Sequence, residues 1–198
     1  MDHVDLYWIP LGAGSRIPIV RWNGRLFEAL TAARQGRRPC DLYHAALEVR
    51  LDGVRVVIEM TPAWGGGRGD RGVVCEGPVG LRWLGRSRFF RYQVRRWRQG
   101  VIPDVAYAVG GAQQVAVGTQ EAQRLLDLVP SFPVATWGRD EQGTGDMWNS
   151  NSLVAWLLAG SGVDLTGIEP PSNGRAPGWS AGVVVSGRSP SSAPGSPG

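Results

Sequence analysis

The feature that most constrains the fold of this chain is a pair of strand-like segments, residues 42–50 and 54–60, joined by Asp52-Gly53. An Asp-Gly pair between two apolar segments is a strong signal for a two-residue β-hairpin. Both segments are rich in apolar residues. We therefore expect the hairpin to lie in the centre of an antiparallel sheet.

Hydrophobic periodicity and turn residues divide the rest of the chain into short strands and a few helices. Further strands are expected over residues 4–9, 17–22, 73–75, 90–97, 115–117 and 183–185, and helices over residues 26–34, 119–129 and 153–158. Thr119 is expected to cap the second helix. The third helix is apolar on nearly all sides, which is typical of a buried helix. This mixed order predicts the α+β class, with an antiparallel sheet packed against a buried helix.

A single domain over residues 1–185 accommodates all of these elements. Residues 186–198 contain only Ser, Gly, Pro, Ala and one Arg, a composition that cannot bury a core, so we expect a disordered tail. No apolar run is long enough to span a bilayer, and the first residues do not resemble a secretory signal. The expected location is therefore cytoplasmic.

Cysteine and histidine are too scarce to support a metal site. The chain has two cysteines, Cys40 and Cys75, which form no CxxC pair, and two histidines, His3 and His44. We expect free thiols and neither a bound metal nor a cofactor.

All 21 basic residues are arginines, and seven of them lie between Arg82 and Arg98, where there is no acidic residue. Such a segment could bind nucleic acid. However, apolar and polar residues alternate over residues 90–95, which predicts a strand with one face in the core and one in water. We favour the solvated face and do not expect a nucleic-acid partner.

Three residues could act together in catalysis. His44 and Glu59 are near neighbours across the predicted hairpin, and a carboxylate beside an imidazole holds its tautomer and stabilises the imidazolium. Ser150 opens the apolar helix, where unpaired backbone N–H groups favour developing negative charge. A serine hydroxyl needs a general base, and His44 is the only suitable histidine.

The residues around Ser150 support two interpretations. Asn149 and Asn151 could cap the helix or donate to an oxyanion, and Ser150 could itself be a helix cap. Trp148 could line a pocket, and Asp146 could contact a polar or cationic substrate, although loop solubility explains the acid equally well. Likewise, His44 could be a hydrogen-bonded core residue and Glu59 an exposed charge.

These residues resemble motifs of the circularly permuted papain-like superfamily, which includes permuted NlpC-type peptidases and lecithin retinol acyltransferase-like proteins. Residues 149–153, Asn-Ser-Asn-Ser-Leu, resemble its Asn-Cys-Asn-x-Phe motif, and residues 44–47 resemble its histidine strand. Glu59 matches the polar position of the next strand. The resemblance covers roughly residues 42–158. Residues 147–152 and 174–179 are also similar to motifs of a bacterial family of unassigned function.

The resemblance implies a permuted papain-like fold with Ser150 in the place of the family's nucleophilic cysteine. Because a serine hydroxyl loses its proton far less readily than a thiol, the substitution has two alternative consequences. One is a hydrolase or acyl/peptidyl transferase that acts on an amide or ester through Ser150, His44 and Glu59. The other is a catalytically inactive papain-like binding module. The substrate would be a small molecule, a peptide or a lipid-like compound.

Overall fold

The computed structural model describes residues 1–13, 28–29, 31–34, 36–63, 72–102, 104–171 and 174–188. The strand expected over residues 17–22 and the tail from residue 189 onward lie outside these ranges. The helix expected over residues 26–34 is confirmed for its described part, residues 28–29 and 31–34.

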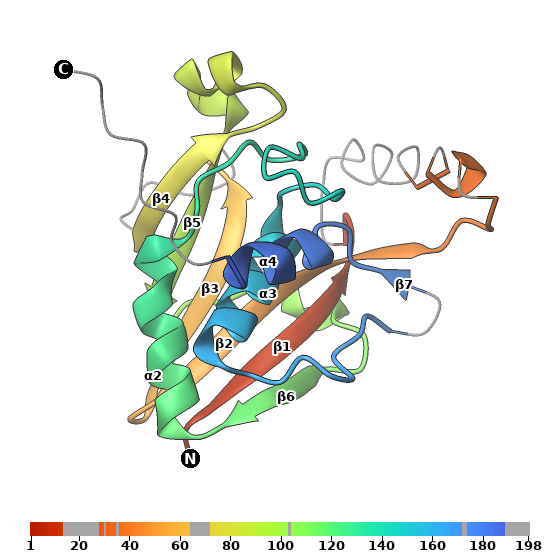
Figure 1. The fold of residues 1–198 in the computed structure, drawn as a ribbon. Helices are drawn as coiled ribbons and strands as arrows, with labels where there is room; N and C mark the ends of the chain where they lie inside the picture. The colour runs from red at the N-terminus through yellow and green to blue at the C-terminus, as the bar shows by residue number, and fades with distance from the viewer. Residues whose placement is uncertain are drawn as a thin grey trace.

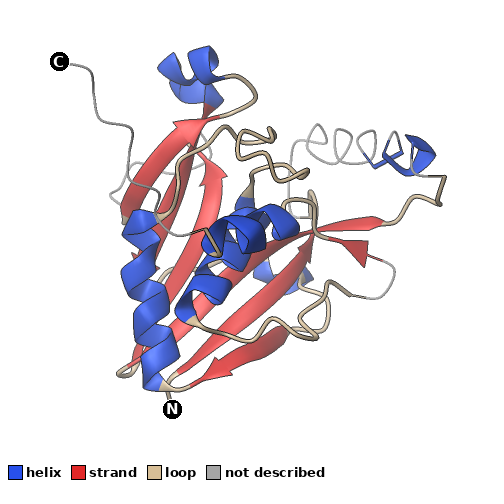
Figure 2. Ribbon diagram, in the orientation of Figure 1, coloured by secondary structure: helices blue, strands red, loops and turns tan. Residues whose placement is uncertain are grey.

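The fold is α+β, with a sheet covered on one face by helices (Figures 1 and 2). Six strands form an antiparallel sheet in the order β4-β5-β3-β2-β1-β6. They are β1 (His3–Pro10), β2 (Asp41–Leu51), β3 (Val54–Pro62), β4 (Val73–Pro78), β5 (Arg91–Arg98) and β6 (Ala112–Val117). A two-residue strand, β7 (Gly174–Arg175), pairs in parallel with the start of β2.

The helices pack on the same face of the sheet (Figure 1). They are α2 (Thr119–Leu128), α3 (Ser150–Ser161) and α4 (Trp179–Ser186). Single 3₁₀ turns occur at η1 (Arg82–Arg86), η2 (Arg88–Phe90), η3 (Val105–Tyr107) and η4 (Val129–Ser131).

The predicted hairpin is confirmed and is central. Asp52 and Gly53 both have positive φ, 51° and 74°, as a two-residue turn of this kind requires. The register runs from Leu51 opposite Val54 to Leu47 opposite Ile58. Odd-numbered residues of β2 therefore face the helices, and even-numbered residues face the opposite side of the sheet.

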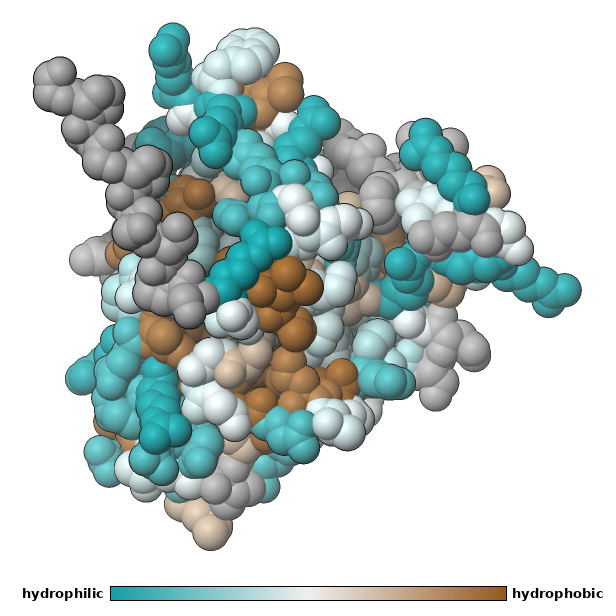
Figure 3. Space-filling model, viewed as in Figure 1, coloured by the Kyte–Doolittle hydropathy of each residue, from teal (hydrophilic) through white to brown (hydrophobic). Residues whose placement is uncertain are grey.

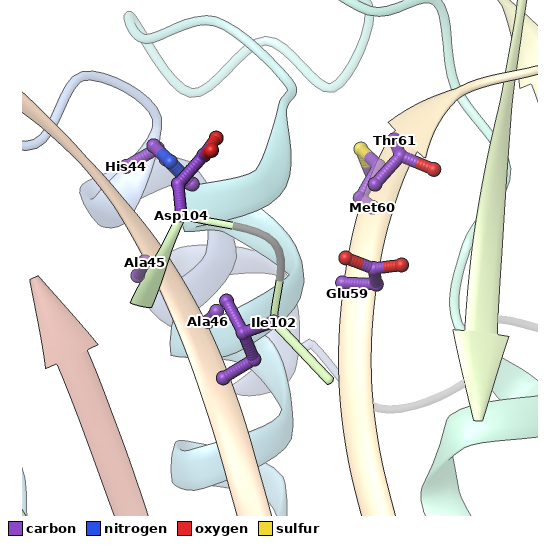
Figure 4. Close-up of a pocket in the computed structure, with 8 residues that line it drawn as sticks. All are labelled: His44, Ala45, Ala46, Glu59, Met60, Thr61, Ile102 and Asp104. Atoms are coloured by element: carbon purple, nitrogen blue, oxygen red, sulfur yellow. The ribbon is translucent and has the colours of Figure 1, made fainter. Parts of the chain in front are cut away.

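Strands β2 and β3 separate beyond this point, and the separation positions the candidate site. No pairing of β2 with β3 continues past Leu47 and Ile58, while β3 stays paired with β5 as far as Pro62. The N-terminus of α3 packs against β2 at this split, and Figure 4 shows α3 behind the two diverging strands. A sheet edge thus opens inside the fold, next to the start of a buried helix.

Helix α3 is the centre of the main core. Nine of its twelve residues are buried, including Leu153, Leu157 and Leu158, as predicted from its apolar composition. Helix α4 packs closely on it: a Cβ on Gly182 would lie 2.3 Å from the carbonyl oxygen of Ser152. Glycine at this position therefore allows the two helix backbones to approach each other.

Two local expectations were wrong. Residues 183–185 belong to helix α4 and do not form a strand, because Ala181 and Val185 pack into the core from one helical face. The N-cap of α2 is Gly118 and not Thr119, because the Thr119 hydroxyl donates to Asp2 Oδ2 at 2.6 Å instead of to the helix.

The expected strand at residues 90–97 exists as β5, but its polar face is not solvated as predicted. Arg95 is only 4% exposed, because β5 lies between β3 and β4 and its polar side chains pair with theirs. Phe90 lies before the strand and is exposed rather than buried. No helix among the described residues is both long and apolar enough to cross a membrane.

Candidate functional site

The start of helix α3 is held by Asn149. Its Oδ1 accepts hydrogen bonds from the backbone amides of Asn151 at 2.9 Å and Ser152 at 3.3 Å. In return, the backbone amide of Asn149 donates to Ser152 Oγ at 3.0 Å, which completes a capping box. Asn149 is therefore the N-cap, and Ser150 is the first residue of the helix rather than its cap.

Asn151 joins helix α3 to the open edge of β2. Its Oδ1 accepts from the amide of Ala45 at 2.7 Å, and its Nδ2 donates to the carbonyl of Tyr43 at 3.0 Å. The other Nδ2 proton goes to the carbonyl of Pro177 at 2.8 Å. The side-chain amide thus replaces the peptide group that β3 would offer if the two strands remained paired. Both of its protons are engaged in these structural bonds.

Ser150 differs from its neighbours in motif 149–152. Its hydroxyl and its backbone amide make no hydrogen bond within the described ranges, although the residue is only 7% exposed. Asn149, Asn151 and Ser152 all make several. An unpaired hydroxyl and an unpaired N–H at a helix N-terminus are free to interact with a ligand.

The Ser150 residue lines a cavity of about 140 Å³. His44 lines the same cavity, and the lining contains no aspartate, glutamate or arginine. The apolar part of the lining comes from Leu11, Leu42, Trp137, Met147 and Pro177. A cavity of roughly this size and character accommodates a group about as large as benzene.

His44 also lines a second cavity, of about 80 Å³, between β2 and β3 (Figure 4). Glu59, Thr61 and Asp104 share this lining. Burial lowers the pKa of His44 to about 4, so the imidazole is neutral at pH 7. Its ring makes no hydrogen bond with any described residue and so has a lone pair available for a proton.

Glu59 was predicted to be a near neighbour of His44 across the hairpin, but β2 and β3 are unpaired at these positions, and the partner identified for Glu59 is another residue. Its carboxylate forms a buried ion pair with Arg95 at 3.5 Å, and the two residues lie opposite each other on β3 and β5. It makes no hydrogen bond to His44, although both side chains line the second cavity. Asp104 lines that cavity too, and burial raises its pKa. No sequence pattern singled out Asp104 as a residue of the candidate site.

Asp146 and Trp148, expected to bind substrate, have structural roles. The Oδ2 of Asp146 accepts from the amide of Gly178 at 2.8 Å and the hydroxyl of Ser180 at 2.7 Å, which holds the start of α4. Trp148 is 1% exposed and stacks on Phe132, with ring centroids 5.1 Å apart. Trp137 and Trp148 flank the loop of residues 138–147, and of the two only Trp137 lines the cavity.

The two motifs at residues 147–152 and 174–179 meet in space. The Asn149 Nδ2 donates to the carbonyl of Pro177 at 2.7 Å, and the Ser152 hydroxyl donates to that of Gly178 at 2.8 Å. Gly178 has φ of 90°, and a Cβ there would lie 2.3 Å from Asn149 Oδ1. Glycine is therefore required at this position for two independent reasons.

The thiols are poor nucleophiles. Burial raises the pKa of Cys75 to about 11, and burial next to the Glu28 carboxylate raises that of Cys40. Among the residues that the structure describes, no three His, Cys, Asp or Glu side chains come together as metal ligands.

The arginines of residues 82–98 do not form a continuous exposed track. Arg82 binds Glu141, Arg91 binds Glu76, and Arg96 donates to a backbone carbonyl of α2. With the burial of Arg95, four of the seven are engaged within the fold.

Comparison with known proteins identifies no relative. No family model matches the chain, and neither the curated proteins nor the solved structures contain a significant match.

Proposed function

We propose that this protein is a hydrolase or acyl/peptidyl transferase that acts on an amide or ester, with Ser150 as the nucleophile and His44 as the general base. One observation carries the proposal. Ser150 is the only residue of the 149–152 motif whose side chain makes no hydrogen bond to a described residue, and it shares a cavity with a neutral histidine whose ring is likewise unpaired within the described ranges.

The chemistry follows from these positions. Ser150 Oγ attacks the carbonyl carbon while its proton passes to the unprotonated ring nitrogen of His44. The carbonyl oxygen gains negative charge, which the free amide of Ser150 and the N-terminus of α3 stabilise. Collapse of the intermediate expels the amine or alcohol, which takes the proton from His44. Water or a second acceptor then attacks the acyl-serine and releases it by the same steps.

The proposed oxyanion donors are backbone groups. Both side-chain protons of Asn151 already have acceptors, and Asn149 uses its Oδ1 on the helix and its Nδ2 on Pro177. These two residues therefore support the reaction by holding α3 against β2. In the same way, the proposal assigns Glu59 to the stability of the buried ion pair with Arg95.

The cavity supports a substrate with an uncharged group next to the scissile bond. Its lining beyond His44 and Ser150 is mainly apolar, and about 140 Å³ holds a short acyl or aromatic group and not a long chain. The remainder of the substrate would lie outside. Phenylacetyl or butyryl esters are suitable first probes, and dodecanoyl esters should react more slowly.

A fluorophosphonate probe tests the proposal directly. Wild-type protein should be labelled once, on the peptide that contains Ser150, and labelling should disappear in Ser150→Ala and fall strongly in His44→Ala. Ser180→Ala, which removes a serine outside the cavity, is the matched control and should label normally. No labelling of the wild type, or equal labelling in Ser150→Ala, would refute the proposal.

A second candidate is a catalytically inactive papain-like binding module. It is favoured by two observations: Ser150 and His44 are not hydrogen-bonded to each other, and no carboxylate of a described residue is hydrogen-bonded to the His44 ring. Catalytic hydrogen bonds often tighten only when substrate is bound, so the first candidate accommodates the same geometry. Under the second candidate, ester probes bind without turnover and with the same affinity in Ser150→Ala. Turnover that requires Ser150 excludes it.

A further inference from the structure

The connection between β4 and β5 exposes an unusual number of large apolar side chains. Residues 81–90, which form η1 and η2, are called the aromatic tip here. Trp83 is 67% exposed, Phe89 is 74% exposed, and Leu81 and Phe90 are 40% and 43% exposed. Neither 3₁₀ turn contains a buried residue, so these side chains are not part of the core.

The aromatic tip projects from one end of the sheet (Figure 1, yellow-green). Figure 3 shows apolar and strongly polar residues side by side at this end of the molecule. An exposed apolar cluster of this kind on a soluble chain marks an interaction surface.

The charge of the aromatic tip has a single sign. It contains Arg82, Arg86 and Arg88 and no acidic residue. Arg82 is bound to Glu141, whereas Arg86 and Arg88 have no ion pair or hydrogen bond within the described part of the chain. Two free guanidinium groups therefore flank the exposed aromatic rings.

We propose that the aromatic tip binds the surface of a membrane that contains anionic phospholipids. Aromatic side chains insert at the level of the headgroups, where one part of the ring is apolar and its edge is polar. Nearby arginines bind lipid phosphates and are attracted by the negative surface potential. The tip combines both kinds of group within ten residues.

The charges favour a lipid surface over nucleic acid. A nucleic-acid strand needs a basic track for its backbone, but the arginines that continue from the tip along β5 are engaged inside the fold: Arg91 with Glu76, and Arg95 with Glu59. Along β5 only Arg98, at the far end of the strand, is exposed and without a side-chain partner among the described residues, so no continuous basic track leads away from the tip. Within the tip, two unpaired guanidinium groups lie close in sequence to the apolar side chains, as in a short insertion loop.

The base of the aromatic tip is connected to the rim of the Ser150 cavity. The amide of Gly80 donates to the carbonyl of Trp137, and the amide of Trp137 donates to the carbonyl of Pro78, both at 2.9 Å. Trp137 lines the cavity. A membrane bound at the tip would therefore contact a segment that is hydrogen-bonded at its base to a residue of the cavity lining. The membrane inference itself does not depend on catalysis by Ser150.

Vesicle co-sedimentation tests the inference. The protein should bind vesicles of phosphatidylcholine that contain roughly 30% phosphatidylglycerol. It should bind pure phosphatidylcholine vesicles much more weakly. Trp83→Ala and Phe89→Ala should each weaken binding roughly tenfold, because partial burial of each ring is lost. Arg86→Ala and Arg88→Ala should each weaken it on the order of fivefold, and added salt should do the same.

Matched controls distinguish binding through the aromatic tip from non-specific adsorption to vesicles. Tyr107→Ala removes an exposed aromatic residue outside the tip, and Arg98→Ala removes an exposed arginine outside it; both should bind like the wild type. Circular dichroism confirms that each variant is folded. The inference is overturned if the wild type does not bind anionic vesicles, or if the tip variants bind as well as the controls. Salt-sensitive binding of single-stranded RNA that depends on Trp83, without vesicle binding, would also overturn it.

Discussion

Replacing Asn151 with alanine removes the side chain that fastens helix α3 to strand β2. The substitution abolishes three hydrogen bonds, to the amide of Ala45 and to the carbonyls of Tyr43 and Pro177. Asn151 is 2% exposed, so water cannot readily take the place of its amide. Ala45 pairs with Trp8 of β1, but it has no partner on β3, because β3 has already separated from β2.

The expected loss can be worked out from these contacts. Three hydrogen bonds contribute about 1 kcal/mol each, and leaving the buried N–H of Ala45 unpaired adds about 1–3 kcal/mol. Alanine recovers roughly 0.5 kcal/mol through its higher helix propensity. Asn151→Ala should therefore lower the free energy of unfolding by about 3.5–5.5 kcal/mol. That is a large share of the ~5–15 kcal/mol typical of a folded domain.

Urea denaturation followed by circular dichroism measures this loss, and Ser150→Ala is the matched control. Ser150 lies one residue earlier on the same helix, but its hydroxyl makes no hydrogen bond within the described ranges, so its replacement should change the free energy of unfolding by less than about 0.5 kcal/mol. We expect that Asn151 stabilises the fold and that the Ser150 side chain does not. A loss below about 1 kcal/mol in Asn151→Ala, or an equal loss in both variants, would refute this expectation.

Three further predictions concern His44, Glu59 and Gly178. Burial lowers the pKa of His44 from 6.5 to about 4, so the unfolded chain binds this proton more readily. The stability that depends on the neutral ring is therefore complete above pH 6.5 and decreases by up to about 3 kcal/mol as the pH falls towards 4. Urea unfolding of wild type and His44→Gln at several pH values should show this difference, and an NMR titration that finds an ordinary pKa would contradict it. Glu59→Ala should cost about 3 kcal/mol, because it leaves the Arg95 charge buried; the double variant with Arg95→Ala should recover part of the loss, and strictly additive losses in a double-mutant cycle would show that the pair is unimportant. Gly178→Ala should cost at least about 2 kcal/mol and lower the melting temperature, whereas Gly143→Ala, which also has positive φ but open space around it, should cost only about 1 kcal/mol; equal losses would count against the close contact with the N-cap.

Local signals in the sequence predicted most of the sheet and its hairpin. Asp52-Gly53 was sufficient because the turn conformation depends on those two residues alone. Helix α3 was predicted for a related reason: its apolar residues on all sides require burial wherever the helix packs. The three residues 183–185 were assigned to a strand because such a short apolar run has no distinguishable period.

The candidate site was only partly predictable. Ser150 and His44, which the sequence grouped together, do line one cavity, and their joint catalytic role stays a prediction. The partner of Glu59 was not predicted, because Arg95 approaches it from β5, 36 positions along the chain, through sheet pairing. The structural role of Asp146 was not predicted either. Its hydrogen bonds to Gly178 and Ser180 join segments that are distant in sequence, so no local pattern indicates them.

The sequence by itself determined that the motif at 149–152 begins a buried helix, because helix starts and apolar burial depend on near neighbours. Only the tertiary structure decided which of those four residues remains unoccupied. Asn149, Asn151 and Ser152 are engaged by Tyr43, Ala45, Pro177 and Gly178, which reach the helix from distant parts of the chain. Ser150 is left facing a cavity because no such group reaches it. Long-range hydrogen bonding, which no local pattern encodes, thus distinguishes the candidate nucleophile from the residues that hold it in place.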